Sequence, residues 1–152
     1  MNNHVTKIAA MLALLLGMSA TPALAHTVGG PIDGQSNNAS ATDLGFVSCY
    51  DDGSGPADHL AVQIEDLSPP VNGLFVSVQI MKADKNAMTN ITDTISADGK
   101  PSPFVSLKGG SGSYYISVNK TKAGVRNFIL NYHCLTSSED HTGTEVGVMQ
   151  LQ

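Results

Sequence analysis

The sequence predicts an all-β protein made of antiparallel strands. Short stretches in which apolar and polar residues alternate occur along most of the chain, and this period of two is typical of half-buried strands. Clusters of Gly, Pro, Asn and Asp separate these stretches, as expected for the turns between antiparallel strands. No stretch combines the apolar spacing of an amphipathic helix with helix-capping residues. We therefore expect about seven strands arranged as a sandwich or a barrel.

The candidate strands of the first half are bounded by strong turn signals. Residues 44–50 end at an Asp-, Gly- and Pro-rich cluster over residues 51–56, whose composition favours a turn. Residues 59–65 place three apolar side chains on one side and stop at two consecutive prolines. Residues 74–81 alternate in the same way, and a polar connection over residues 82–90 follows.

The second half continues the same pattern. The longest candidate strand carries Phe128, Leu130, Tyr132 and Cys134 on one side. A loop over residues 136–144 separates it from the last candidate. The candidates of this half are residues 91–95, 104–107, 114–118, 125–135 and 145–151.

The first 25 residues have the three parts of a secretory signal peptide of the Sec type. Lys7 precedes a short apolar run over residues 8–16, and Ala23-Leu24-Ala25 matches an A-x-A cleavage site. We expect cleavage after Ala25, export to the periplasm or the extracellular medium, and His26 as the first residue of the mature chain. The apolar run is shorter than the roughly 20 residues that span a bilayer. No membrane insertion is therefore expected after cleavage.

The mature chain of 127 residues suits one domain with a core of its own. Residues 26–42 are rich in Gly, Asn, Ser and Ala and lack periodicity, which indicates a flexible N-terminal arm. Residues 43–152 are expected to form the β-domain.

The charge balance excludes some classes of partner. The chain contains 8 Lys and Arg against 13 Asp and Glu, and loss of Lys7 with the signal peptide leaves a net charge of −6. Non-specific nucleic-acid binding depends on basic residues that neutralise phosphates, so nucleic acid is not an expected partner. An anionic membrane surface is disfavoured for the same reason. The acidity itself favours solubility.

The two cysteines predict one disulfide bond. Cys49 and Cys134 both lie in the mature chain, 85 residues apart, and an even count in an exported protein favours pairing. The chain-entropy model gives a loop of this length an upper contribution of roughly 4.5 kcal/mol to stability.

Residues 113–151 resemble the end of an immunoglobulin-like sandwich. A strand, a short turn at Ala123-Gly124, a long strand and a final hairpin follow in the order of strands E, F and G. Tyr132 lies two residues before Cys134, which is similar to the tyrosine corner of that fold. The resemblance implies an immunoglobulin-like β-sandwich with Cys134 on a strand beside the last one. The chain contains no Trp, so the core Trp of antibody domains is missing.

Four histidines of the mature chain are the candidate metal ligands. A mature N-terminal His26 would offer a metal both its α-amino group and its ring Nδ1. If the last hairpin is centred near Ser137, His133 and His141 face each other, close enough for two imidazoles to share a metal. His59 is a further candidate. Imidazole and amine ligands favour Cu(II), with Zn as the second choice. Exposed histidines in polar loops are also often only solvated.

The sequence contains no recognisable catalytic pattern. It lacks a G-x-S-x-G elbow, an H-E-x-x-H motif, a P-loop and a Rossmann glycine pattern, so we do not expect an enzyme. The first functional hypothesis is a secreted or periplasmic, non-catalytic interaction domain whose partner is an unknown protein or small ligand. The alternative is a periplasmic copper-binding protein that uses His26 with His133 and His141. At His26 alone, the sequence is similar to periplasmic copper carriers and copper monooxygenases, whose mature chains also begin with histidine. Cu(II) is the cofactor that the sequence favours, with Zn as the second choice.

Overall fold

The computed structural model describes residues 26–152. The expected signal peptide and its cleavage site after Ala25 fall on residues 1–25, outside the described residues. The described chain contains nine strands: β1 (His26–Ile32), β2 (Thr42–Tyr50), β3 (His59–Asp66), β4 (Val76–Lys82), β5 (Ala87–Asp93), β6 (Val105–Lys108), β7 (Gly112–Lys120), β8 (Arg126–Leu135) and β9 (Gly143–Gln150).

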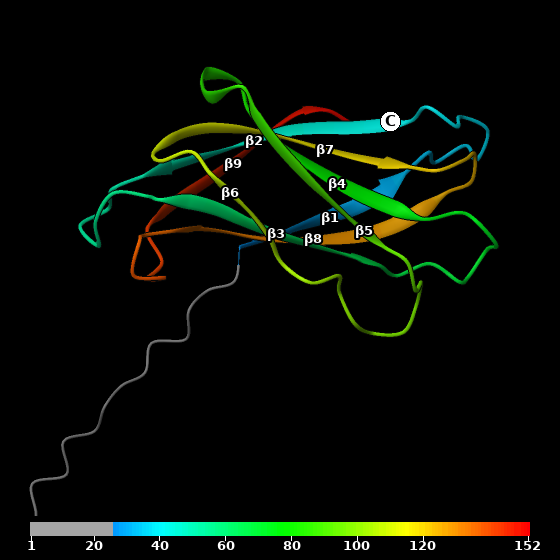
Figure 1. Cartoon of the computed structure of the whole chain (residues 1–152). Helices are drawn as coiled ribbons and strands as arrows, with labels where there is room; N and C mark the ends of the chain where they lie inside the picture. The colour runs from blue at the N-terminus through cyan, green and yellow to red at the C-terminus, as the bar shows by residue number, and fades with distance from the viewer. Residues whose placement is uncertain (1–25) are drawn as a thin grey trace, which may run out of the picture.

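The strands form two antiparallel sheets that lie one above the other as two layers (Figure 1). One sheet has the order β1-β8-β3-β6 and the other the order β5-β4-β7-β2-β9. Over residues 26–152 the only helical element is a single 3-10 turn at Ala83–Lys85, and no helix there is long and apolar enough to cross a membrane. The predicted all-β fold with two stacked sheets is confirmed.

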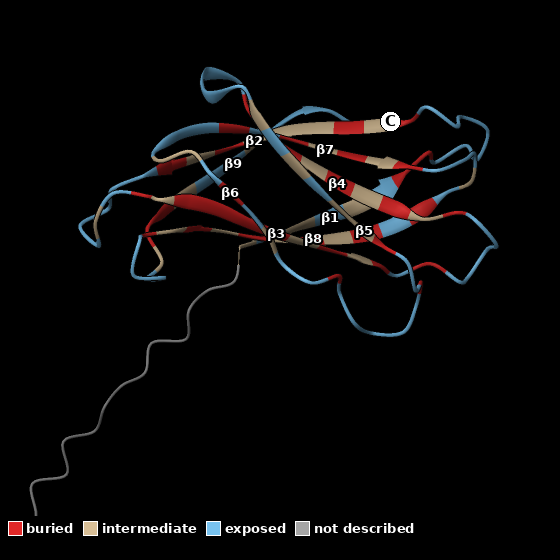
Figure 2. Ribbon diagram, viewed as in Figure 1, coloured by how far each residue is buried: buried red, intermediate tan, exposed pale blue. Residues whose placement is uncertain are grey.

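The core lies between the two layers, as the alternation predicts. On β4, β7 and β8 the buried residues follow a period of two, whereas the first four residues of β3 are all buried. Figure 2 shows buried stretches on the strands and mostly exposed loops. On β8 the buried side chains are the predicted ones: Phe128, Leu130, Tyr132 and Cys134. Complete burial of an apolar side chain such as Phe128 or Leu130 contributes about 1.5–3 kcal/mol.

The predicted disulfide bond is confirmed and joins the two sheets. Cys49 on β2 and Cys134 on β8 are bonded, with Cα atoms 5.5 Å apart, and both residues are buried. Such a bond is compatible with a periplasmic or extracellular location.

A regular strand forms where we expected part of a flexible arm. β1 pairs with β8 along its whole length, from His26 opposite Tyr132 to Ile32 opposite Arg126. Pairing satisfies the backbone groups along that edge of β8, and Ile32 is fully buried. Two adjacent glycines interrupt the apolar alternation of β1, which explains why the sequence pattern missed this strand.

β5 also begins earlier than predicted. It starts at Ala87 and pairs with β4 across a short turn, whereas we expected a polar connection up to residue 90. Asn86 takes a left-handed conformation in this turn, with φ of 48°, which Asn tolerates better than most residues. The strand is polar because it lies at the edge of its sheet.

The last strand lies in the other sheet from the one we expected. β9 pairs with β2 and not with β8, so the predicted hairpin between the Cys134 strand and the final strand is wrong. Only an isolated bridge between Leu135 and His141 remains of it. The Thr142 hydroxyl lies 2.9 Å from the Tyr50 carbonyl oxygen and 2.7 Å from that of Gly55. These contacts hold the chain at β2, where it enters the five-stranded sheet.

Candidate functional site

Three of the four candidate histidines meet at one end of the four-stranded sheet. His133 lies near the end of β8, His26 is the first residue of β1, and His141 follows the loop after β8. The ring centroids of His133 and His141 are 4.5 Å apart, and those of His26 and His133 are 6.4 Å apart. Residues from three separate parts of the chain therefore form this cluster, which we call the histidine cluster.

Strand register brings His26 to the cluster. β1 and β8 run antiparallel with His26 opposite Tyr132. The ring centroids of His26 and Tyr132 are 5.8 Å apart. The register alone places His26 on the same face as Tyr132, and the 6.4 Å between the ring centroids of His26 and His133 shows that His26 also approaches the next residue of β8. The edge strand that replaces the expected arm is therefore what positions His26.

His133 and His141 meet in a register that differs from the predicted one. His141 lies opposite Leu135, two residues further along β8 than His133. Because strand side chains alternate between faces, a shift of two residues leaves both histidines on the same face. They contact each other diagonally instead of directly across the bridge.

The ring nitrogens of the cluster include two without a partner. The Nδ1 atoms of His26 and His133 are both buried and form no hydrogen bond within the described chain. A buried polar atom without a partner costs about 1–3 kcal/mol. Such an atom is therefore a good candidate for a ligand to a bound ion.

The cluster favours the neutral form of its central histidine. Burial lowers the pKa of His133, and the neighbouring His141 and His26 lower it further because additional positive charge would repel them. A neutral imidazole is the form that coordinates metals. The arrangement thus favours a neutral His133 side chain.

Phe104 completes the surroundings of the cluster. Its ring centroid is 5.7 Å from that of His133, and it lies directly before β6. The sequence offered no signal for this contact, because it depends on the pairing of β6 with β3.

His59 lies apart from the histidine cluster. Its Nδ1 is 2.9 Å from an Asp58 carboxylate oxygen, and its Nε2 is 3.5 Å from Glu139. Both ring nitrogens thus face carboxylates, and no ring contact joins His59 to the other three histidines in residues 26–152.

The cluster does not form a metal site as it stands. In the described part of the chain, no group of three or more His, Cys, Asp or Glu side chains is arranged to hold a metal ion. The close pair of His133 and His141 supplies two ligands, and a third would have to come from a rotation of His26.

Comparisons of the chain with protein-family models, with curated proteins and with solved structures found no match.

Proposed function

We propose that the protein is an exported copper-binding β-sandwich domain whose site is formed by His133 and His141 and completed by His26. The observation that supports this most is the convergence of three imidazoles at which two buried Nδ1 atoms lack a partner. A buried nitrogen without a hydrogen-bond partner can be satisfied by a metal ion that accepts its lone pair. Nitrogen ligands without thiolate favour Cu(II) among the divalent first-row metals.

Processing after Ala25 would add a fourth nitrogen to this site. Cleavage there frees the α-amino group of His26, which is attached to the same residue as one of the two unpartnered Nδ1 atoms. Two nitrogens from one residue can form a chelate that compensates for the distance of His26 from His133. The amine is therefore the feature that distinguishes the mature site from that of the unprocessed chain.

We also propose that the sandwich is a variant of the immunoglobulin-like fold. β4, β7 and β2 pair in the order of strands D, E and B, while β3 pairs with β8 as strand C does with F. The disulfide between β2 and β8 joins the positions of strands B and F. The edges differ, because β9 takes the place of strand A beside β2 and β1 that of strand G beside β8.

The test of the copper proposal is a Cu(II) titration of the secreted protein, purified without a tag and with its N-terminus sequenced. We expect one tight site that His133→Ala and His141→Ala each weaken at least tenfold. His59→Ala is the matched control and should leave the affinity unchanged, because His59 lies outside the cluster. An N-terminal extension should weaken binding by removing the amine.

Two results would count against the proposal. Equal affinity of the His133→Ala variant and the wild type would mean that the N-terminal residue alone chelates the metal. Absence of binding to protein that starts at His26 would leave the other hypothesis, a non-catalytic interaction domain. That second function is favoured by a different feature, an apolar groove between β1 and β9.

A further inference from the structure

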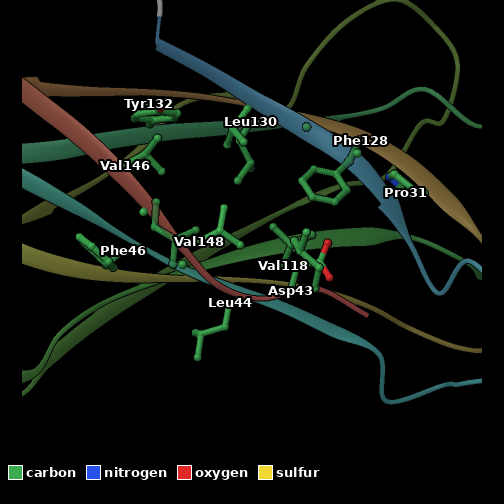
Figure 3. Close-up of a pocket in the computed structure, with 17 residues that line it drawn as sticks. Pro31, Asp43, Leu44, Phe46, Val118, Phe128, Leu130, Tyr132, Val146 and Val148 are labelled. Atoms are coloured by element: carbon green, nitrogen blue, oxygen red, sulfur yellow. The ribbon is translucent and has the colours of Figure 1, made fainter.

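Along one side of the sandwich the edge strands of the two sheets do not pair with each other. At one end of this side the Asp33 backbone amide donates a hydrogen bond of 2.7 Å to the Gln152 carbonyl oxygen. A groove of about 200 Å³ runs between the edge strands β1 and β9. We call it the seam groove; it is lined by Val28 and Gly30 on β1, Phe128 and Leu130 on β8, and Val146 and Val148 on β9. Figure 3 shows the β8 side chains pointing toward the two valines of β9. The groove therefore opens directly onto the hydrophobic core.

A glycine at a core-facing position leaves the groove empty. Gly30 lies opposite Phe128 in the strand register, and directly opposite residues share a face of the sheet. A Cβ atom added at Gly30 would meet no atom within 4 Å. Glycine within a strand costs stability relative to residues with side chains, and here neither a turn nor a close backbone contact requires it.

The valines on the other side of the groove are exposed although they belong to the interior face. Val146 lies opposite the fully buried Val47 in the β2–β9 register, so it faces the space between the sheets. Nevertheless 43% of Val146 and 59% of Val148 are exposed. Exposed apolar surface that continues into a core is typical of a binding site.

The rims of the groove are unprotected strand edges. β1 and β9 are the outermost strands at this side of their sheets, and their outer edges pair with no strand in residues 26–152. Edge strands are usually protected by charges, but β1 contains no Asp, Glu, Lys or Arg and β9 contains only Glu145. Pro31 interrupts the donors of β1, whereas β9 contains no proline.

A single carboxylate gives the groove its charge. Asp43 lines the groove near one end, and its Oδ1 accepts a hydrogen bond of 2.7 Å from the Gln152 backbone amide. No group of the described chain donates to Oδ2. Burial raises the pKa of Asp43 more than the Gln152 hydrogen bond lowers it. No basic residue lines the groove, so a cationic group would complement it.

We propose that the seam groove binds an extended peptide segment of a partner protein. The segment pairs with the free edge of β9, inserts alternate apolar side chains over Gly30 and places a Lys or Arg side chain at Asp43. The volume favours this occupant. About 200 Å³ accommodates one or two side chains, since a 150 Å³ cavity holds benzene, whereas pockets for whole small molecules usually measure about 300–1,000 Å³. Addition of a strand to an open edge is a common mode of peptide recognition. This inference does not depend on the copper site.

The test uses a fluorescent nine-residue peptide in which valine and serine alternate and the last residue is lysine. Fluorescence polarisation with the secreted protein should show saturable binding. Gly30→Leu fills the groove and should weaken binding at least tenfold without lowering the Tm. Val148→Glu places a charge on an exposed rim, where it does not disturb folding, and should weaken binding to a similar extent. Replacement of the peptide lysine by glutamate should also weaken binding, through Asp43.

Three comparisons can overturn the proposal. The control variant Asn90→Leu adds an apolar side chain to β5, at the opposite edge of the same sheet, and should bind like the wild type. If both groove variants also bind like the wild type, the groove is not the site. If a peptide N-methylated at its serines and a second peptide N-methylated at its valines both bind equally well, strand pairing is not involved. A reversible dimer that Val148→Glu abolishes, without peptide binding by the wild type, would identify a second copy of the chain as the occupant.

Discussion

Two tyrosines of the core differ in what their hydroxyl groups contact. The Tyr114 hydroxyl donates a hydrogen bond of 2.7 Å to the Gly110 carbonyl oxygen, and burial raises its pKa to about 12. The Tyr132 hydroxyl, predicted to form the tyrosine corner, makes no hydrogen bond to the described chain, and its ring instead contacts His26. The spacing before Cys134 is therefore present without the bond that defines the corner.

These contacts predict different costs for removing each hydroxyl group. Tyr114→Phe should lower the free energy of unfolding by about 1–2 kcal/mol, because it leaves the Gly110 carbonyl without its partner. Tyr132→Phe should change it by less than about 0.5 kcal/mol. Urea denaturation of the two variants measures both values. A larger loss of unfolding free energy for Tyr132→Phe than for Tyr114→Phe would indicate that the Tyr132 hydroxyl forms the hydrogen bond of a tyrosine corner.

A buried ion pair fixes the chain between β1 and β2. Asp33 and Lys120 are both buried, and their charged atoms are 2.8 Å apart. The Asp33 carboxylate also accepts hydrogen bonds from the backbone amides of Asn37, Asn38 and Gly124. Burial by itself would raise the pKa of Asp33, but the bonds from Lys120 and the three amides hold it well below its usual range.

This lowered pKa predicts how stability depends on pH. A carboxyl group with a lowered pKa in the folded state stabilises the fold above its unfolded pKa of about 3.9, and the contribution is lost as the pH falls toward the folded value. Asp33→Asn should therefore be less stable than the wild type at pH 7, and the difference should shrink below about pH 4. Urea denaturation from pH 7 to pH 2 measures it. A difference that stays constant down to pH 2 would show that Asp33 acts through shape and not through charge.

At the scale of the strands, the sequence predicted those in which apolar and polar residues alternate. It missed β1, which is defined by its pairing with β8. Leu60, Val62 and Ile64 defined β3 because each second side chain enters the core. β1 has glycines at two positions where such a pattern would be read, and its pairing partner lies about 100 residues further along the chain. The exchange of edge strands could not be predicted either, because local sequence does not specify which sheet a terminal strand joins.

Part of the histidine cluster was predictable because side chains two residues apart on a strand share a face. The predicted hairpin register was wrong by two residues, yet His133 and His141 still share a face, whereas a shift by one residue would have separated them. The position of His26 depends on β1, and His59 was placed with the candidates because its contacts to Asp58 and Glu139 could not be read from sequence. Phe104 and the seam groove arise from tertiary packing alone.

At the scale of the whole molecule, one covalent bond joins the two sheets near the histidine cluster. Cys134 follows His133 directly on β8, and its partner Cys49 lies on β2 in the other sheet. The imidazoles themselves belong to the four-stranded sheet and the loop after it. We therefore expect the disulfide to stabilise the sandwich as a whole without setting the positions of the three rings.

Removal of the disulfide should show whether it stabilises the fold, positions the histidine rings, or does both. The double variant Cys49→Ala, Cys134→Ala should lose about 2–5 kcal/mol of unfolding free energy, because a loop of 85 residues is no longer closed in the unfolded chain. Below its lowered Tm, the variant should bind Cu(II) with the same stoichiometry and within a few-fold of the wild-type affinity, because the β1–β8 register and the Leu135–His141 bridge remain. Thermal denaturation followed by circular dichroism and a Cu(II) titration at 10 °C measure the two effects. If the folded variant loses copper binding, the rings depend on the contact between the sheets, and the site belongs to the whole sandwich rather than to one of its layers.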